Sequence, residues 1–146
     1  MKRALFALVL VSALVACDRA PTALHVQRVL VHTAVGQFEP LDRTITDVSV
    51  VADLDAVVRA LPPAPYTPGA ETFCPISWGL RYQLTFTHSS DPTLIATVEA
   101  DGCRYAYLGP TDRRATTESF WAGLAAALGY YTRGNDLFPL PNDMRR

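Results

Sequence analysis

Three cysteines and three histidines are the residues of this sequence whose side chains can bind metals or do redox chemistry. They are Cys17, His25, His32, Cys74, His88 and Cys103. A structural zinc site needs such ligands in closely spaced groups, and these six are scattered along the chain. The sequence therefore predicts no metal and no cofactor.

Catalytic motifs are also missing from the sequence. It contains no Gly-x-Ser-x-Gly, no His-Glu-x-x-His, no phosphate-binding glycine loop and no dinucleotide-binding fingerprint. A Ser/His/Asp triad is assembled only by the fold, and no spacing in this chain motivates one. We therefore expect a protein that is not an enzyme.

Length and charge narrow the class of protein further. The chain has 146 residues, of which 49% are hydrophobic, so it holds enough apolar material for one core. Its formal net charge is -1, without the basic excess that nucleic-acid binding requires. We expect a single domain that does not bind nucleic acid.

The first 17 residues, MKRALFALVLVSALVAC, have the pattern of a secretory leader. Two basic residues precede an apolar run over 4–14, which is long enough for a signal peptide and too short to span a bilayer. The run ends in Leu14-Val15-Ala16-Cys17. This ending resembles the bacterial lipoprotein signal motif, in which the cysteine thiol is lipidated and the bond before it is cut.

The resemblance implies a signal peptide over residues 1–16 and a lipidated tether over 17–23. Cys17 would then carry acyl chains, palmitate among them, and two or more chains on one residue anchor a protein firmly. The expected partner is therefore a membrane, contacted through the lipid anchor. The expected location is the extracytoplasmic face of the cell membrane.

Lipidation of Cys17 would leave Cys74 and Cys103 as an even pair outside the cytoplasm. In an oxidising compartment such a pair predicts a disulfide, which would stabilise the fold by roughly 3–4 kcal/mol on the chain-entropy model. Two free thiols or a metal site are the alternatives. The metal site lacks clustered histidine or cysteine partners.

Hydrophobic periodicity predicts five strands and two helices after the tether. The expected strands cover 24–33, 43–46, 79–88, 93–100 and 104–108. The expected helices cover 48–61, capped by Asp47, and 117–128, capped by Thr116 or Thr117. The predicted fold is α+β, a four- to five-stranded antiparallel sheet with two amphipathic helices on one face and one disulfide, forming a single domain over 24–146.

Turn and loop residues separate these elements. Residues 89–92 and Asp101-Gly102 predict turns between strands. Residues 109–115 predict a polar loop in which Arg113 and Arg114 are solvated, with contact to an anion or a lipid headgroup as the alternative. Trp78 and Trp121 are expected in the core or at its edge, although Trp78 could instead line a small apolar pocket.

A second resemblance covers most of residues 43–128. Its markers are Cys74-Pro75, Gly79, Tyr82, Gly102-Cys103 and Phe120-Trp121. They are similar to those of a family of uncharacterised secreted bacterial proteins, often lipoproteins. The resemblance implies the same compartment and fold, and no activity.

A third resemblance is to the secreted subtilisin-inhibitor family. The order of two strands, a helix and a Cys-Pro that leads into a long hairpin closing at Gly-Cys is similar. In that family the residues after the first of these cysteines bind the protease, which implies a loop of Pro75, Ile76 and Ser77 with Ile76-Ser77 as the scissile position. The chain departs from the family in lacking its other disulfide and in adding a helix over 117–128.

Together these observations predict a lipid-anchored, non-enzymatic extracytoplasmic domain that binds an unknown envelope protein or small ligand. The candidate binding loop consists of Pro75, Ile76, Ser77 and Trp78, held in place by the expected disulfide. The alternative function is a secreted-type serine protease inhibitor acting through Cys74 to Trp78.

Overall fold

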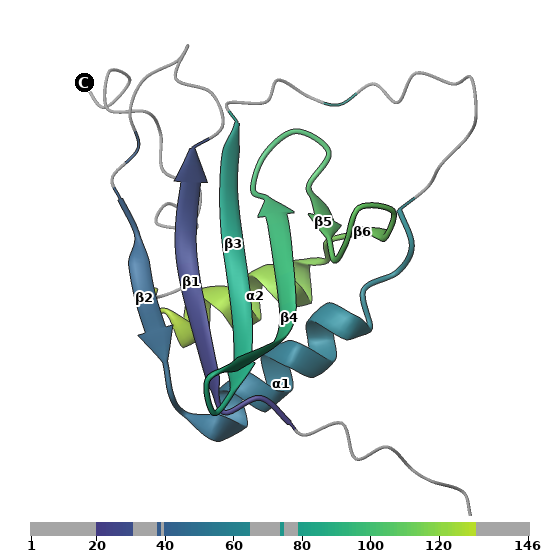
Figure 1. Ribbon diagram of the computed structural model, residues 1–146. Helices are drawn as coiled ribbons and strands as arrows, with labels where there is room; N and C mark the ends of the chain where they lie inside the picture. The colour runs from purple at the N-terminus through teal and green to yellow at the C-terminus, as the bar shows by residue number, and fades with distance from the viewer. Residues whose placement is uncertain (1–19, 31–37, 39, 65–73, 75–78, 131–146) are drawn as a thin grey trace, which may run out of the picture.

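The computed structural model describes residues 20–30, 38, 40–64, 74 and 79–130. Six strands form one sheet in the order β2-β1-β3-β4-β5-β6, and every neighbouring pair is antiparallel (Figure 1). In chain order the elements are β1 (Ala23–Leu30), β2 (Asp42–Ile45), α1 (Val48–Arg59), β3 (Leu80–His88), β4 (Asp91–Glu99), β5 (Tyr105–Tyr107), β6 (Arg113–Ala115) and α2 (Glu118–Ala127). The α+β prediction with one antiparallel sheet, two helices and one disulfide is confirmed.

Strand β3 shows why the sheet has one apolar and one polar face. Its sequence LRYQLTFTH alternates, and successive side chains of a strand point to opposite faces. Its apolar side chains are buried, whereas the polar ones between them are only half-buried; the buried residues are Leu80, Tyr82, Leu84 and Phe86. We call the face that carries the polar side chains the outer face.

Helix α1 begins at the residue that its cap predicts. Asp47 accepts hydrogen bonds at Oδ1 from the backbone N–H groups of Ser49 (3.0 Å) and Val50 (3.3 Å), which are free at a helix start. The helix buries Val51, Leu54 and Val58. Two prolines at 62 and 63 follow its last turn, where they cannot continue the helix.

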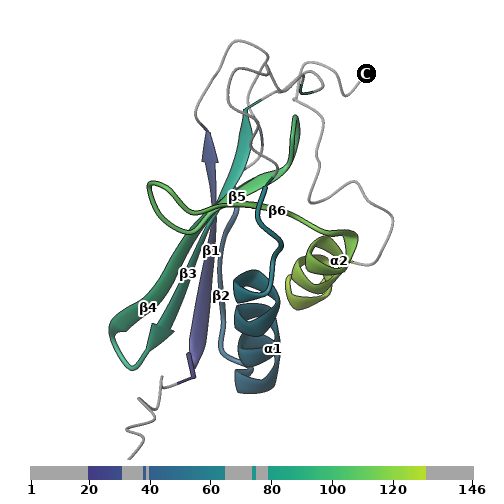
Figure 2. The same cartoon turned by 90° about the vertical axis from the view of Figure 1, so that its right-hand side faces the viewer.

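Helix α2 packs beside α1. Thr117 caps it by accepting at Oγ1 from the Phe120 N–H (3.2 Å), and it buries Phe120, Trp121 and Leu124. A Cβ at Gly123 would lie 3.3 Å from Leu54 Cδ2, so the glycine lets the two helices approach closely. Both helices lie on the same side of the sheet (Figure 2), opposite the outer face.

The described residues form a sheet of six strands, so the prediction of four or five was too low. The additional strand is β6, which lies inside the segment 109–115 that was predicted as a polar loop. It has only three residues, and it is held on both sides: β5 pairs with one edge, and the residues after α1 bond to the other through Ala64 N–H to Arg113 carbonyl (3.0 Å). These contacts join distant segments, and a three-residue strand has too little sequence to show a period of two.

Several boundaries also differ by one or two residues from their predictions, and α1, for example, ends at Arg59 instead of at 61. The β3–β4 turn is confined to Ser89 and Ser90, because β4 begins at Asp91, and the ladder carries a bulge between Phe86 and Thr87. A bulge adds one unpaired residue to a strand, which shifts the pairing by one position. Strand β1 ends within the described residues at Leu30, and the remainder of the expected strand, 31–33, lies outside them.

Candidate functional site at the disulfide end

A disulfide joins Cys74 to Cys103, as the sequence predicts. The two Cα atoms are 4.9 Å apart, within the range that a disulfide spans, and 29 positions separate the residues in sequence. Cys103 lies in the β4–β5 turn, and Cys74 stands before the segment that leads into β3. The bond therefore closes a loop that contains the whole β3–β4 hairpin.

Backbone and side-chain hydrogen bonds connect the β4–β5 turn to the start of β3. Asp101 accepts at Oδ2 from the Leu80 N–H (3.3 Å), and the Ala100 N–H donates to the Leu80 carbonyl (2.9 Å). Gly102 adopts a φ of 63°, a left-handed conformation that glycine takes without strain. The turn that holds Cys103 is thus fixed against the neighbouring strand.

The same turn is bonded to the start of α2. The Arg104 carbonyl accepts from both the Thr116 N–H (3.1 Å) and the Thr116 hydroxyl (2.7 Å). Trp121 is buried and donates its Nε1–H to Thr116 Oγ1 (3.0 Å). We call this turn, residues 101–104, together with Cys74 and the start of β3, the disulfide end.

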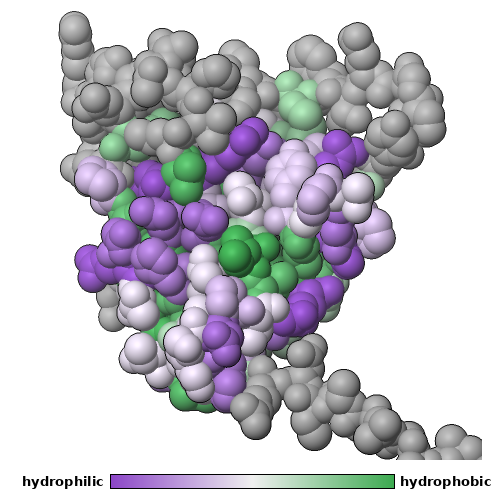
Figure 3. Space-filling view, viewed as in Figure 1, coloured by the Kyte–Doolittle hydropathy of each residue, from purple (hydrophilic) through white to green (hydrophobic). Residues whose placement is uncertain are grey.

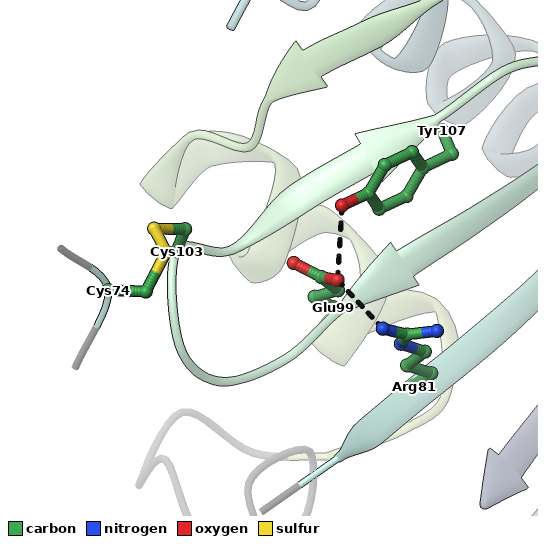
Figure 4. The surroundings of a disulfide bond; sticks show 5 residues. All are labelled: Cys74, Arg81, Glu99, Cys103 and Tyr107. Carbon is green, nitrogen blue, oxygen red and sulfur yellow. Dashed lines mark hydrogen bonds and ion pairs between the residues drawn. A yellow bond between two sulfur atoms is a disulfide. The ribbon is translucent and has the colours of Figure 1, made fainter. Parts of the chain in front are cut away.

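Three polar side chains meet on the outer face beside the disulfide (Figure 4). Arg81 on β3 lies directly opposite Glu99 on β4, and its Nη2 donates to Glu99 Oε1 (3.1 Å). Tyr107 on β5 donates its hydroxyl to the same oxygen (3.2 Å). The side chain of Arg81 is 36% exposed and that of Glu99 is 16% exposed, so the carboxylate is the more buried member of the pair.

Burial raises the pKa of the Tyr107 hydroxyl, and the nearby Glu99 carboxylate raises it further. The phenol therefore remains a hydrogen-bond donor at neutral pH. Glu99 is held by two donors, which orients it as part of a polar network. Such an arrangement suits recognition of a polar partner through the guanidinium and the phenol ring.

Arg113 and Arg114 lie on β6 instead of in the predicted polar loop, where both are half-buried and engaged by the fold. The Arg113 guanidinium lies over the Tyr105 ring, 4.5 Å from its centroid. Arg114 forms an ion pair with Asp112 and donates from Nη1 to the Leu61 carbonyl (2.8 Å). The hydrogen bond from Arg114 lowers the pKa of Asp112. Arg114 thus joins β6 to the end of α1.

The two histidines that the structure describes, His25 and His88, have different partners. His25 on the outer face of β1 pairs through Nε2 with Asp42 Oδ1 (2.8 Å), a contact that sequence reasoning missed. His88 ends β3, and His32 lies outside the described residues. Across residues 20–30, 38, 40–64, 74 and 79–130, no group of three or more potential metal ligands is found.

The predicted binding loop of Pro75, Ile76, Ser77 and Trp78 lies outside the described residues, as does Cys17. Both neighbours of the loop are described. Cys74 is bonded to Cys103, and Gly79 leads directly into β3, whose first residue is held by Asp101. In the part of the chain that the structure describes, no helix is long and apolar enough to span a membrane.

The cluster of Arg81, Glu99 and Tyr107 was not predicted from the sequence. The available signal is the pairing of opposite charges across a hairpin, because residues directly opposite in adjacent strands interact. The bulge between Phe86 and Thr87 hides that signal. Counting outward from Ser89-Ser90 without it would place Arg81 opposite Val98 instead of Glu99.

Comparison with known proteins finds no family model that matches the chain, and no curated protein or solved structure that matches it significantly.

Proposed function

We propose that this protein is a lipid-anchored extracytoplasmic domain that binds an envelope protein or a small ligand without catalysing a reaction. The observation that carries the proposal is the Cys74–Cys103 disulfide. It uses two of the three cysteines and suits an oxidising compartment. Cys17 is then the one cysteine left for lipidation, at the end of the leader-like segment.

The outer face supports a role in binding. An antiparallel sheet can pack one face on its core and present the other to solvent. The side seen in Figure 1, with the helices behind the sheet, is covered mostly by hydrophilic and neutral side chains, with a smaller hydrophobic patch near its middle (Figure 3). Ile95, on the outer face of β4, is 47% exposed.

The composition of this face beside the disulfide is that of a recognition surface. Tyrosine and arginine are enriched at protein interfaces, where they supply large contact areas and several hydrogen bonds. Both residue types occur here, as Arg81 beside Tyr107 and as Arg113 over Tyr105. We assign the binding site to this surface together with the loop 75–78 that the sequence predicts.

Membrane fractionation tests the anchor. The full chain is expressed in a bacterium that processes lipoproteins, and the wild type is expected in the membrane fraction. The Cys17→Ser variant is expected in the soluble fraction or as uncleaved precursor. Cys74→Ala/Cys103→Ala is the matched control, because it removes the other two cysteines and keeps the anchor. Equal partitioning of wild type and Cys17→Ser would contradict the proposal.

Site-specific photocross-linking tests the binding surface. A photoreactive phenylalanine analogue replaces Tyr107 on the outer face or, as a matched control, the exposed Ala122 on α2. In intact cells, the outer-face position is expected to give a discrete adduct that the Ala122 position does not give. Adducts of equal yield at both positions would contradict the assignment of the binding site to the outer face.

Inhibition of a serine protease is a second candidate function, favoured by the way the structure fixes both neighbours of the loop 75–78. A loop that is held at both ends loses little conformational freedom on binding. If this candidate holds, the protein inhibits secreted subtilisin-like proteases, Ile76→Val retains inhibition and Ile76→Asp abolishes it. An inhibitory activity that Ile76→Asp leaves unchanged would exclude the loop.

A further inference from the structure

The short link between Cys17 and the folded domain determines which end of the domain lies at the membrane. This inference rests on the proposed lipid anchor. The Thr22 N–H donates to the Thr87 carbonyl (2.8 Å), and the ring of His88 donates from Nδ1 to the Ala20 carbonyl (3.0 Å). Pro21 is buried between these two bonds. The chain is therefore attached to the end of β3 from Ala20 onward.

Covalent geometry then limits the reach of the anchor. Three residue steps separate Cys17 from Ala20, and even a fully extended chain of that length spans at most about 11 Å. The lipidated residue therefore lies within about 11 Å of Ala20, whatever path the chain takes. A link of this length brings the attached end of the domain to the lipid headgroups.

Several elements share this attached end, which we call the hairpin end. It comprises the start of β1 at Ala23, the β3–β4 turn at Ser89-Ser90 and the start of α1 at Val48. Figure 1 shows these three features together at the bottom of the molecule, and the β4–β5 turn at the opposite end of the strands. Strand β3 has nine residues, so the two ends lie about 30 Å apart.

We infer that the lipid anchor orients the domain with its hairpin end in contact with the lipid surface and its disulfide end away from the bilayer. The outer face, with Ile95 and the hydrophobic patch near its middle, is the surface that we propose for partner binding, so the bilayer contact is assigned to the hairpin end. Ile95 and Val48 are the exposed large hydrophobic side chains among the described residues, and Val48 belongs to the hairpin end itself. The surface of Arg81, Glu99 and Tyr107 is then presented to partners at the far end of β3.

Depth-dependent fluorescence quenching tests this orientation. The full chain is purified with its acyl groups and reconstituted into phosphatidylcholine vesicles that contain a headgroup-labelled quencher lipid. A maleimide fluorophore is attached at Ser90→Cys on the hairpin end or at Gln83→Cys on the outer face of β3. The native Cys74–Cys103 pair does not react while it is oxidised. The same labelled proteins in detergent without quencher are the reference.

The Ser90 label is expected to lose most of its fluorescence on reconstitution, whereas the Gln83 label keeps most of it. Equal losses, or a larger loss at Gln83, would overturn the inference, because the domain would then lie with its sheet along the bilayer. Vesicle flotation separates this failure from failure of the anchor. A chain that does not float and is quenched at neither position would refute the lipid anchor and the orientation together.

Discussion

The two ends of the sheet are held in different ways. At the disulfide end a covalent bond and side-chain hydrogen bonds join residues far apart in sequence, as in the contacts of Cys74 with Cys103 and of Thr116 with Arg104. At the hairpin end the turn is two residues long and the helix cap is local, with Asp47 bonded to Ser49. The disulfide end is therefore fixed by a covalent bond together with tertiary hydrogen bonds, whereas the hairpin end has a local turn and a local cap and is tied to the N-terminal segment by the hydrogen bonds of Thr22 and His88.

This difference suits the two roles that we propose for the ends. A recognition surface benefits from rigidity, because binding then costs less conformational entropy. An attachment point needs only a short, well-placed link, which the bonds of Thr22 and His88 supply. Substitutions at the disulfide end should therefore cost more stability than substitutions at the hairpin end.

The largest effect is expected from removing the disulfide. Cys74→Ala/Cys103→Ala opens a loop with a separation of 29 residues, so the chain-entropy model predicts a loss of roughly 3–4 kcal/mol in the free energy of unfolding. Urea unfolding of the wild type and the double variant measures it, and reduction of the wild type should reproduce the same loss. An unchanged unfolding midpoint would contradict the proposed difference between the two ends, because the covalent bond would then not stabilise the disulfide end.

The next effect concerns the hydrogen bonds between the turn and α2. Thr116→Val keeps the shape of the side chain and removes the hydroxyl that bonds the Arg104 carbonyl and accepts from Trp121. The free energy of unfolding should fall by about 1–2 kcal/mol. Thr111→Val is the matched control, since Thr111 is exposed in the β5–β6 loop. Equal midpoints for the two variants in urea unfolding would contradict the assigned role of Thr116.

A smaller effect is expected on the outer face. Glu99→Gln removes the ion pair with Arg81, and a partly exposed pair of this kind contributes less than about 1 kcal/mol. The substitution has a clearer consequence for the pH dependence of stability in alkaline solution. The raised pKa of Tyr107 gives stability that is fully present below its ordinary pKa of about 10 and is lost as the pH rises through the folded value.

The wild type should therefore lose more stability between about pH 9 and about pH 11 than Tyr107→Phe does. Glu99→Gln should fall between them, because the carboxylate contributes to the raised pKa while burial, the larger cause, remains. The midpoints of urea unfolding across this pH range measure how the stability of each of the three proteins depends on pH. Identical pH dependence of wild type and Tyr107→Phe would show that the phenol does not titrate as the structure predicts.

The smallest effect is expected from the cap at the hairpin end. Asp47→Ala removes the acceptor for the Ser49 and Val50 N–H groups, so the melting temperature should fall slightly at neutral pH. The hydrogen bond from the Ser49 side chain is the largest cause of the lowered pKa of Asp47. The stabilisation by this charge is therefore present above the ordinary pKa of about 4 and is lost as the pH falls through the lower folded value.

Thermal melts of wild type, Asp47→Ala and Asp47→Asn between neutral and strongly acidic pH measure this effect. The asparagine variant controls for the charge, because its side-chain oxygen still caps the helix. A fall in melting temperature that is larger for Asp47→Ala than for the disulfide variant would contradict the expectation that substitutions at the disulfide end cost more stability.

Local patterns explain which elements could be predicted. The alternation over 80–88, the helical stripe of Val51, Leu54 and Val58, and the cap at Asp47 each lie within a few residues, so sequence alone predicts them. Strand β6 could not be found, because its evidence is the pairing with β5 and with residues 62–64. The disulfide was predicted from cysteine count and compartment instead of spacing.

The candidate site was predictable only in part, for a similar reason. Cys74 and Cys103 were found by counting cysteines, but the neighbouring cluster needs the exact register between β3 and β4, which a bulge shifts by one residue. The interaction of Arg113 with Tyr105 likewise needs β6 to be known first. The hydrophobic pattern of a strand shows which face a residue occupies, but it does not show which residue lies opposite.

The intact mass of the mature chain, extracted from bacterial membranes, is the most direct test of the central claim that Cys17 is lipidated while the other two cysteines are joined. We predict a chain that begins at Cys17, carries the added mass of its acyl groups, and gains two hydrogen atoms on reduction. A chain that begins elsewhere, or one with an unmodified Cys17, would contradict the lipid anchor and the orientation derived from it.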